Sequence, residues 1–327
     1  MQKWMSLVVC VPAAVMTPQV YAQEQQARPF QVVRLDQAFD QALQAAPTPP
    51  TQSDITRLAQ VIAEHQPIYA RLGHNAPKLY AKIAFSNHAI AQDNVRTRAY
   101  FNQRDLTQEV KRLRQKTIKA LGIQPRYPTV YYLAYGYRRG TNAQTQSGAT
   151  TKDGKTHVYL NLVALARQRH WESAIVHETI HTLQGLVLPK ETTLLTRTML
   201  EGVPTYLAQA IQGHLSDADA MFWSPEQWQA AEKHRQAIIQ AFAQQRHVTD
   251  PQQMTTFLQL HKPLQSVPGA PDRTGYYVGF LAVKAWVRQN PERPLQELLS
   301  VSPKEFWQAL EQDMQNISVT QRDRTIL

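Results

Sequence analysis

The sequence has almost no cysteine. Cys10 is the only cysteine among 327 residues, and it lies near the start of the chain. Residues 1–22 have the features of an export signal, with Lys3 followed by an apolar run and then Ala22 as the expected cleavage site. Disulfide bonds therefore cannot stabilise the mature chain, and a large apolar core is needed instead.

Long apolar runs are also missing. The run inside the signal is too short to span a bilayer, and no later stretch approaches the roughly 20 apolar residues that a transmembrane helix needs. Val9 stands before Cys10, where a lipid-attachment site prefers a small residue, so the sequence does not favour a lipid anchor. We expect an exported protein, periplasmic or secreted, without a transmembrane segment.

Acidic residues are fewer than basic ones. The formal net charge is +10, and removal of Lys3, the only charged residue in 1–22, leaves +9. Such a balance favours anionic surroundings. The basic residues are scattered, and the one dense run, Lys111–Lys119, is typical of a solvated helix face. We therefore predict no nucleic-acid partner.

The order of sequence patterns predicts a mostly helical α+β protein with one catalytic domain. Gln, Ala and Pro dominate the residues after the signal, which predicts a poorly ordered leader. Apolar residues then recur at helical intervals, give way to a short β-rich part, and return to helical intervals. The predicted boundaries are 1–22 for the signal, 23–55 for the leader and 56–327 for the domain, divided into a helical scaffold (56–122), a small sheet (123–165) and a helical zinc-site part (166–327).

Two strands are predicted just before the segment that carries the main motif. Thr129–Tyr135 and Thr156–Leu162 are rich in β-branched and aromatic residues, and a polar segment separates them. The second strand precedes the motif helix directly, so we expect a small, antiparallel-edged sheet just before that helix.

The motif is the segment from His177 to His181, which reads His-Glu-Thr-Ile-His. On a helix the two histidines lie one turn apart, so both rings can bind one ion, and zinc accepts this arrangement. Glu178 lies beside them, where a carboxylate can take a proton from a metal-bound water. The alternative is an ordinary amphipathic helix with two polar histidines.

A third zinc ligand has to come from elsewhere. A third histidine at metzincin spacing is excluded, because Gln184 and Val187 occupy the positions that would hold Gly and His. Glu191 stands beside Lys190 in a turn region, where an exposed carboxylate is expected. Glu201 is flanked by apolar residues, and a buried carboxylate needs a partner such as zinc. We predict Glu201 as the third ligand.

These motifs resemble those of the gluzincin zinc metalloproteases, and more closely those of a bacterial family of predicted secreted zinc proteases. That family combines the histidine motif with a downstream Glu-Gly and a late Gly-Tyr-Tyr helix. The matching residues here are Glu201, Gly202, Tyr206, Gly275, Tyr276, Tyr277 and Gly279. Pro204 departs from the small apolar residue that is usual in the family. The resemblance covers about the last 150 residues and implies a zincin-like fold with one catalytic Zn²⁺.

The resemblance also implies roles for residues around the ion. Tyr276 or Tyr277 would donate a hydrogen bond to the oxyanion, and Arg273 would bind a substrate carboxylate. Tyr159 and Asn161 would line the cleft along the edge strand, beside an extended substrate. The alternatives are that the tyrosines pack in the core of a helix and that Tyr159 and Asn161 belong to an ordinary half-buried strand.

Together these patterns predict a zinc peptidase. Its substrate would be a peptide or protein, including one associated with the cell envelope. Two alternatives use the same residues: a non-catalytic binding or assembly protein of the cell envelope, and a zinc amidase that acts on wall peptides. The presence of Glu178 between the histidines argues for an enzyme, because a binding protein has no obvious chemical reason to keep a general base.

Overall fold

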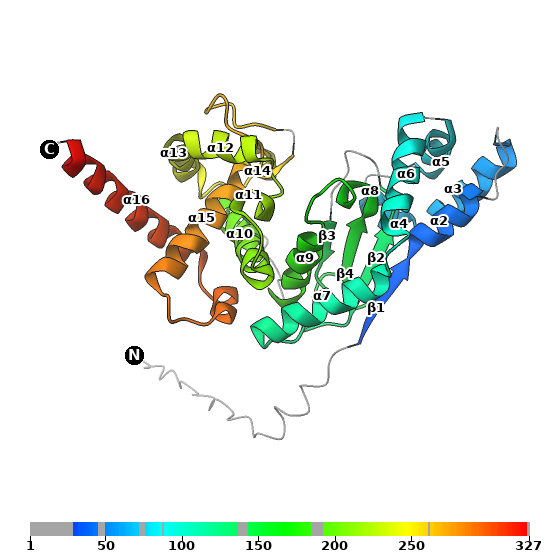
Figure 1. Cartoon of the computed structure of the whole chain (residues 1–327), viewed down its shortest axis with the longest axis horizontal. Coiled ribbons are helices and arrows are strands. Elements are labelled where there is room, and N and C mark those ends of the chain that lie inside the picture. Colours follow the sequence, from blue (N-terminus) through cyan, green and yellow to red (C-terminus); the bar gives the residue numbers. More distant parts are fainter. Residues whose placement is uncertain are drawn as a thin grey trace, which may run out of the picture.

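The computed structural model describes residues 29–44, 50–71, 76–86, 88–136, 143–184, 192–260 and 262–325. The predicted signal lies outside these residues. The chain forms two halves (Figure 1). The sheet half contains β1 (Phe30–Arg34), α2 (Leu35–Gln44), α3 (Gln52–Glu64), α4 (Gln66–Arg71), α5 (Pro77–Ser86), α6 (His88–Phe101), α7 (Leu106–Leu121), β2 (Thr129–Ala134), β3 (Ala143–Gln146), β4 (Thr156–Asn161), α8 (Leu162–Leu165) and α9 (Glu172–Gln184).

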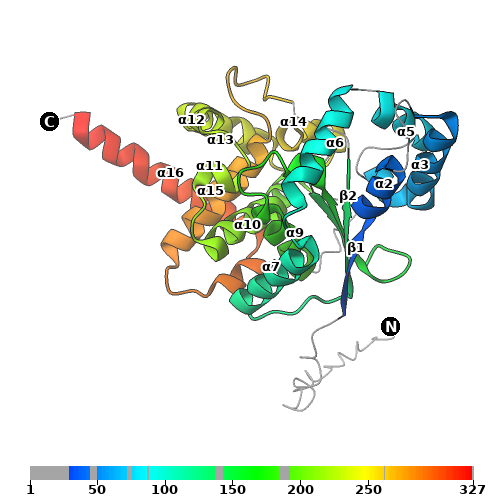
Figure 2. The same cartoon turned by 45° about the vertical axis from the view of Figure 1, so that its right-hand side comes forward.

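The helical half follows α9 in the chain. It contains α10 (Leu194–Gln212), α11 (Asp217–Ala220), α12 (Pro225–Lys233), α13 (Arg235–Gln245), α14 (Pro251–Leu258), α15 (Thr274–Gln289), the 3₁₀ helix η1 (Leu295–Leu299) and α16 (Pro303–Thr325). The end of α16 extends away from the other helices, as both views show (Figure 2).

The sheet has four described strands in the order β1-β2-β4-β3. Strands β1, β2 and β4 are parallel, and β3 is antiparallel to β4 at the edge. The prediction of a mostly helical α+β protein with a small, antiparallel-edged sheet is therefore confirmed. β2 and β4 begin at the predicted residues and end one residue early. The edge strand is β3, from the polar segment between them, and the expected edge strand, β4, is internal.

The predicted leader is wrong for residues 30–44. Phe30 aligns with Thr129 and Arg34 with Leu133 in a parallel pair, so β1 belongs to the sheet. α2 follows at once and buries Phe39 completely in the core. The strand is short and its partner lies about a hundred residues away, so local composition gave no signal of it. Residues 23–28 and 45–49 lie outside the described part of the chain.

One face of the sheet supports the motif helix. Tyr131 and Val158 are paired neighbours on that face, and both are buried. The hydroxyls of Tyr131 and Thr179 form a hydrogen bond of 2.9 Å that joins β2 to α9. Helices α7 and α9 pack together on this side (Figure 2). The sheet thus fixes the position of α9 from behind.

The helical half is organised around the contact between α10 and α15. Gly202 of α10 faces Gly279 of α15, and a Cβ on either residue would overlap backbone atoms of the other helix. Two glycines are therefore needed for the helix axes to approach this closely. The contact fixes the start of α15, including Tyr276, beside Glu201.

We expect Gly202→Ala to destabilise the protein. Replacing glycine by alanine in a helix is favourable by about 1 kcal/mol. Overpacking a rigid backbone contact costs about 1–3 kcal/mol, so the cost of overpacking should exceed the gain in helix propensity. Denaturant unfolding measures the change. Gly213→Asn, at the left-handed C-cap of the same helix and in open space, is the matched control and should change little. A stabilised Gly202→Ala protein would contradict this packing.

Candidate metal site

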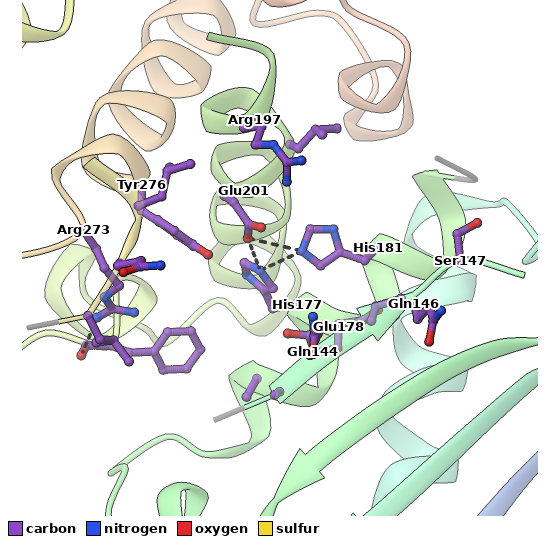
Figure 3. A pocket seen from close by; sticks show the side chains of 18 of the residues that line it. Gln144, Gln146, Ser147, His177, Glu178, His181, Arg197, Glu201, Arg273 and Tyr276 are labelled. Carbon is purple, nitrogen blue, oxygen red and sulfur yellow. Dashed lines mark hydrogen bonds and ion pairs between the residues drawn. The ribbon is translucent and has the colours of Figure 1, made fainter. Parts of the chain in front are cut away.

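Three donor atoms meet where the two halves join. His177 and His181 extend from one face of α9, and Glu201 extends from α10 opposite them (Figure 3). The Nε2 atoms of the two histidines are 3.1 Å apart, and each lies 3.3 Å from Oε2 of Glu201. Among the described residues, this is the group of three whose donors could hold a metal ion. Glu191, the other carboxylate considered, lies outside the described residues.

The geometry of the triangle fits a small divalent ion. With bonds of about 2.0–2.1 Å, the donors of a tetrahedral ion are separated by about 3.3 Å. The three separations observed here match that edge without any movement of the helices. Two imidazoles and one carboxylate also form a donor set that zinc accepts.

The site is electrostatically coupled. Burial alone would lower the pKa of His181, but the carboxylate of Glu201 outweighs it and raises that pKa to about 9. Burial alone would raise the pKa of Glu201, yet the two histidines hold it well below its usual range. Together these shifts describe a strong His181–Glu201 ion pair. Glu201 therefore attracts the histidines before any ion contributes.

A glutamine fixes the ring of His181. Nδ1 of His181 lies 2.8 Å from Oε1 of Gln184, one turn further along α9. When an ion displaces the second proton of His181, the proton that stays on Nδ1 leaves Nε2 with a lone pair directed at the triangle. The amide nitrogen of Gln184 in turn donates to the carbonyl oxygen of Leu200 at 3.5 Å. That carbonyl is available because Pro204, four residues later, has no N–H to bond with it.

Pro204 therefore has a place in the site, although the sequence marked it only as a departure from a family pattern. α10 continues through it without ending. The oxygen it releases lies beside Gln184, whose other end holds His181. The proline, the glutamine and the histidine form one chain of contacts from α10 to α9.

We expect Gln184→Leu to weaken Zn²⁺ binding by about 10–100-fold, because it removes the partner that orients a histidine ligand. Competition with a chromogenic chelator measures the affinity. Gln259→Leu, in the same cleft but away from the histidines, is the control. Pro204→Ala should also weaken Zn²⁺ binding. It should have no further effect in the Gln184→Leu variant, because Pro204 acts on His181 through Gln184. Equal affinity in Gln184→Leu and the wild type would exclude this role.

Glu178 is held by the edge strand. The Thr145 hydroxyl, on β3, lies 2.7 Å from Oε2 of Glu178 and 3.2 Å from its backbone oxygen. Glu178 is 7% exposed, so its carboxylate is desolvated and benefits from a donor. The residue thus fastens β3 to α9 next to the donor triangle.

The triangle lies in a cleft of about 850 Å³. One wall is β3 together with Ser147 and Thr150, and another is α10 with Arg197 and Leu200. Phe222, the segment after α14 and the start of α15 complete it. The volume is within the range of about 300–1,000 Å³ that is usual for ligand sites.

Backbone strain is concentrated at this cleft. Phe222 and Arg273 both have φ of 54°, and they are the non-glycine residues with positive φ in the described chain. The guanidinium of Arg273 donates to the carbonyl oxygens of Met221 and Phe222, at 3.0 and 3.4 Å. Each such conformation costs of order 1–3 kcal/mol, and such strain clusters at functional sites. Neither conformation can be predicted from the local sequence pattern.

The side chains of the two predicted tyrosines point in different directions. Tyr276 lines the cleft, with its hydroxyl directed toward the donor triangle (Figure 3), and burial raises its pKa well above its usual value. Tyr277 turns away, because its hydroxyl donates to Glu232 at 2.6 Å and its ring packs against Trp223 and Trp228. Of the two tyrosines between which the sequence left the choice open, Tyr276 is therefore the one that lies beside the donor triangle.

Arg273 lines the cleft, but its guanidinium is already engaged. The residue is 9% exposed, and its donors are directed at backbone oxygens of the segment before α12. The lowered pKa of Arg273 reflects this burial. Arg273 stabilises the wall of the cleft. This role differs from the predicted one, in which Arg273 binds a substrate carboxylate.

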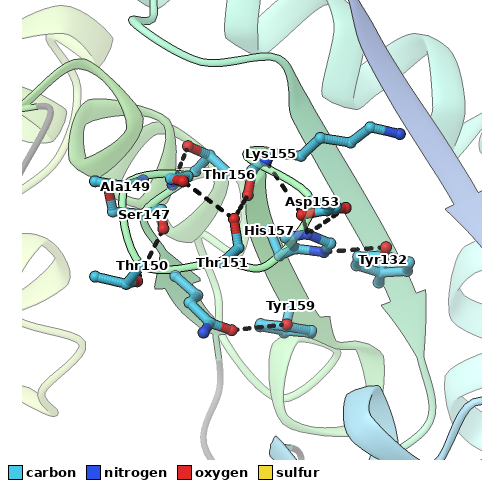
Figure 4. Close-up of polar contacts among 12 residues, drawn as sticks. Tyr132, Ser147, Ala149, Thr150, Thr151, Asp153, Lys155, Thr156, His157 and Tyr159 are labelled. Atoms are coloured by element: carbon cyan, nitrogen blue, oxygen red, sulfur yellow. Dashed lines mark hydrogen bonds and ion pairs between the residues drawn. The ribbon is translucent and has the colours of Figure 1, made fainter.

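Tyr159 and Asn161 do not line the cleft. Tyr159 stacks with Tyr132 on the face of the sheet, and its hydroxyl bonds Gln146 at 3.3 Å (Figure 4). Asn161 is fully buried, and its side-chain oxygen accepts from the N–H of Gly136 and caps α8. The predicted substrate contacts are wrong for both residues, because β4 is internal and β3 borders the cleft.

Comparison with known proteins places the chain in a family. Residues 18–309 match the family described as gliding motility protein GldB, so the chain belongs to this family of gliding motility lipoproteins. No curated protein and no solved structure shows significant similarity to the chain.

The family match overturns the assignment as an enzyme. The sequence resembled gluzincins and predicted secreted zinc proteases, but the matched family is a gliding motility family and not one of zinc peptidases. The predictions of a hydrolase and a metalloprotease are therefore wrong. The prediction of a bound metal holds in part, because the three donors could hold an ion. The catalytic roles predicted for Glu178, Tyr276 and Tyr277 depended on the enzyme assignment. The three-donor site itself does not depend on that assignment.

The family also bears on location. Membership in a family of lipoproteins supports a place in the cell envelope. None of the described helices combines the length and the hydropathy that a membrane crossing requires. Cys10 lies before the matched residues and outside the described part of the chain.

Proposed function

We propose that the chain is a non-catalytic binding or assembly protein of the cell envelope, in which one Zn²⁺ joins the sheet half to the helical half. Family membership over residues 18–309 is the observation that carries the non-catalytic role. The donor triangle, with two ligands on α9 and one on α10, carries the role of the ion.

An ion at this position would act as a clamp. His177 and His181 are fixed by the sheet behind α9, and Glu201 is fixed by the close packing of α10 on α15. Zinc bonded to both sets of ligands would hold the two halves at one separation. That separation sets the width of the cleft, because α10 and β3 form its walls. A bound zinc contributes to folding free energy whether or not it takes part in a reaction.

Glu178 has a structural use in such a protein. Its carboxylate accepts the Thr145 hydroxyl and so fixes the edge strand against α9. This contact supplies a reason, other than catalysis, for a glutamate between the two histidines. The presence of Glu178 between the histidines is therefore compatible with a protein that is not an enzyme.

The partner we propose is a peptide or protein segment of the cell envelope. β3 is the terminal strand of the described sheet, and its four residues border the cleft. An edge strand can pair with an extended segment through backbone hydrogen bonds. Nucleic acid is not proposed as a partner, because the basic residues are scattered. We place the folded domain outside the cytoplasm, periplasmic or secreted after removal of 1–22.

Elemental analysis of purified residues 23–327 should find one zinc per chain. His177→Ala and Glu201→Ala should lose it, and His214→Ala, a surface histidine, should keep it. Free zinc at 100 times its Kd should stabilise the wild type by about 2.7 kcal/mol and leave the two ligand variants unchanged. A wild type without zinc would contradict the clamp.

The zinc-loaded chain should also leave a mixed peptide library intact, as judged by mass spectrometry. Glu178→Gln should behave like the wild type in this assay, since the proposed role involves no proton transfer. Cleavage by the wild type that disappears in Glu178→Gln would overturn the non-catalytic proposal.

A further inference from the structure

The charges around the cleft indicate what kind of ligand it would accept. Glu178 and Glu201 are the carboxylates that line it, and Arg197 and Arg273 are the guanidiniums. The two pairs offset one another. Outside the lining, Asp272 lies 3.8 Å from Arg273 and offsets part of its charge. A divalent ion on the donor triangle would therefore leave the cleft with a net positive charge. A ligand that enters this cleft is favoured if it is anionic.

The donor triangle leaves a position for such a ligand. Zinc takes four ligands in tetrahedral sites, and the protein supplies three. The open side is the cleft, because all three donors line it and the side chain of Glu201 is 27% exposed there. A ligand oxygen could reach the ion from this side without displacing a protein donor.

Arg197 stands beside that position. It lies one turn before Glu201 on α10, so both side chains occupy the same face of the helix. Figure 3 shows its guanidinium directed toward Glu201 and His181. Arg197 is exposed and forms no ion pair with another described residue. Arg273, in contrast, is committed to backbone oxygens.

We propose that the cleft binds a carboxylate of its peptide ligand, with one carboxylate oxygen on the ion and the other on Arg197. This inference rests on the proposed zinc clamp and names the chemistry of its ligand. A planar carboxylate offers two oxygens, and a guanidinium offers two donors that match them. The hydroxyl of Tyr276 lies on the side of the donor triangle opposite Arg197 (Figure 3).

A carboxylate suits this cleft better than a free inorganic anion. The cleft of about 850 Å³ extends well past the ion along β3 and its polar neighbours Gln144, Gln146 and Ser147. A peptide can present a carboxylate to the ion and backbone groups to β3 at the same time. The carboxylate can be the chain terminus or an acidic side chain, and the two sources share the same chemistry.

Isothermal titration of the zinc-loaded chain with three matched peptides tests the proposal. The first is acetylated tetra-alanine with a free terminal carboxylate, the second is its C-terminal amide, and the third is an amide with one alanine replaced by aspartate. At least one carboxylate peptide should bind at least about tenfold more tightly than the neutral amide. Which of the two carboxylate peptides binds identifies the source.

Two further measurements assign the contacts. The Arg197→Gln variant should retain one zinc per chain, and its affinity for the carboxylate peptide should be about tenfold lower than that of the wild type. Arg126→Gln, an exposed arginine outside the cleft, removes the same charge and should leave the affinity unchanged. With Co²⁺ in place of zinc, the carboxylate peptide should change the visible absorption of the ion, and the amide should not.

The outcomes separate this inference from the proposed function. If zinc binds and the three peptides behave alike, or if inorganic phosphate binds more tightly than either carboxylate, the carboxylate site is wrong and the clamp stands. If Arg197→Gln and Arg126→Gln weaken binding equally, the attraction is only that of net charge and the Arg197 contact is wrong. If no zinc binds, both proposals fail.

Discussion

The structure depends on a carboxylate that is held beside two histidines where its halves join. Glu201 and His181 form an ion pair at the base of a cleft, and His177 completes a triangle with sides of 3.1–3.3 Å. Withdrawing a carboxylate from water is unfavourable unless charge and hydrogen bonds compensate it. The histidines supply that compensation here, and a divalent ion would supply more.

The surroundings of Glu201 follow from this requirement. Gly202 lets α15 approach α10, which brings Tyr276 to the cleft. Pro204 releases the carbonyl oxygen of Leu200, which holds Gln184 and through it His181. In the sequence, Gly202 matched a family pattern and Pro204 departed from it. In the structure, local packing and hydrogen bonding explain why each residue is present. The same reasons apply whether or not the site carries out a reaction.

Helix periodicity made the core of the site predictable from the sequence. Histidines four residues apart on a helix must lie on one face, and a carboxylate among apolar neighbours needs a partner, so the grouping of His177, His181 and Glu201 could be foreseen. The strands at 129 and 156 were equally clear, because β-branched and aromatic residues mark them. These features depend on local pattern or on the cost of burial.

Other features depend on contacts that no local pattern encodes. β3 is four residues of weak strand preference, and its pairing with β4 decides that it borders the cleft. Tyr276 and Tyr277 are adjacent on α15, and only the packing of Tyr277 against Trp228 and Glu232 decides which one faces the donor triangle. Function was the largest error, because the five-residue motif specifies a metal-binding geometry and not the chemistry that follows.

Amide hydrogen exchange with and without zinc tests most directly whether an ion joins the two halves. If an ion joins the halves, zinc slows exchange in both α9 and α10, and Glu201→Ala abolishes the protection in both helices. Protection confined to α9 and unaffected by Glu201→Ala would show that the histidines bind the ion alone, and would contradict the clamp.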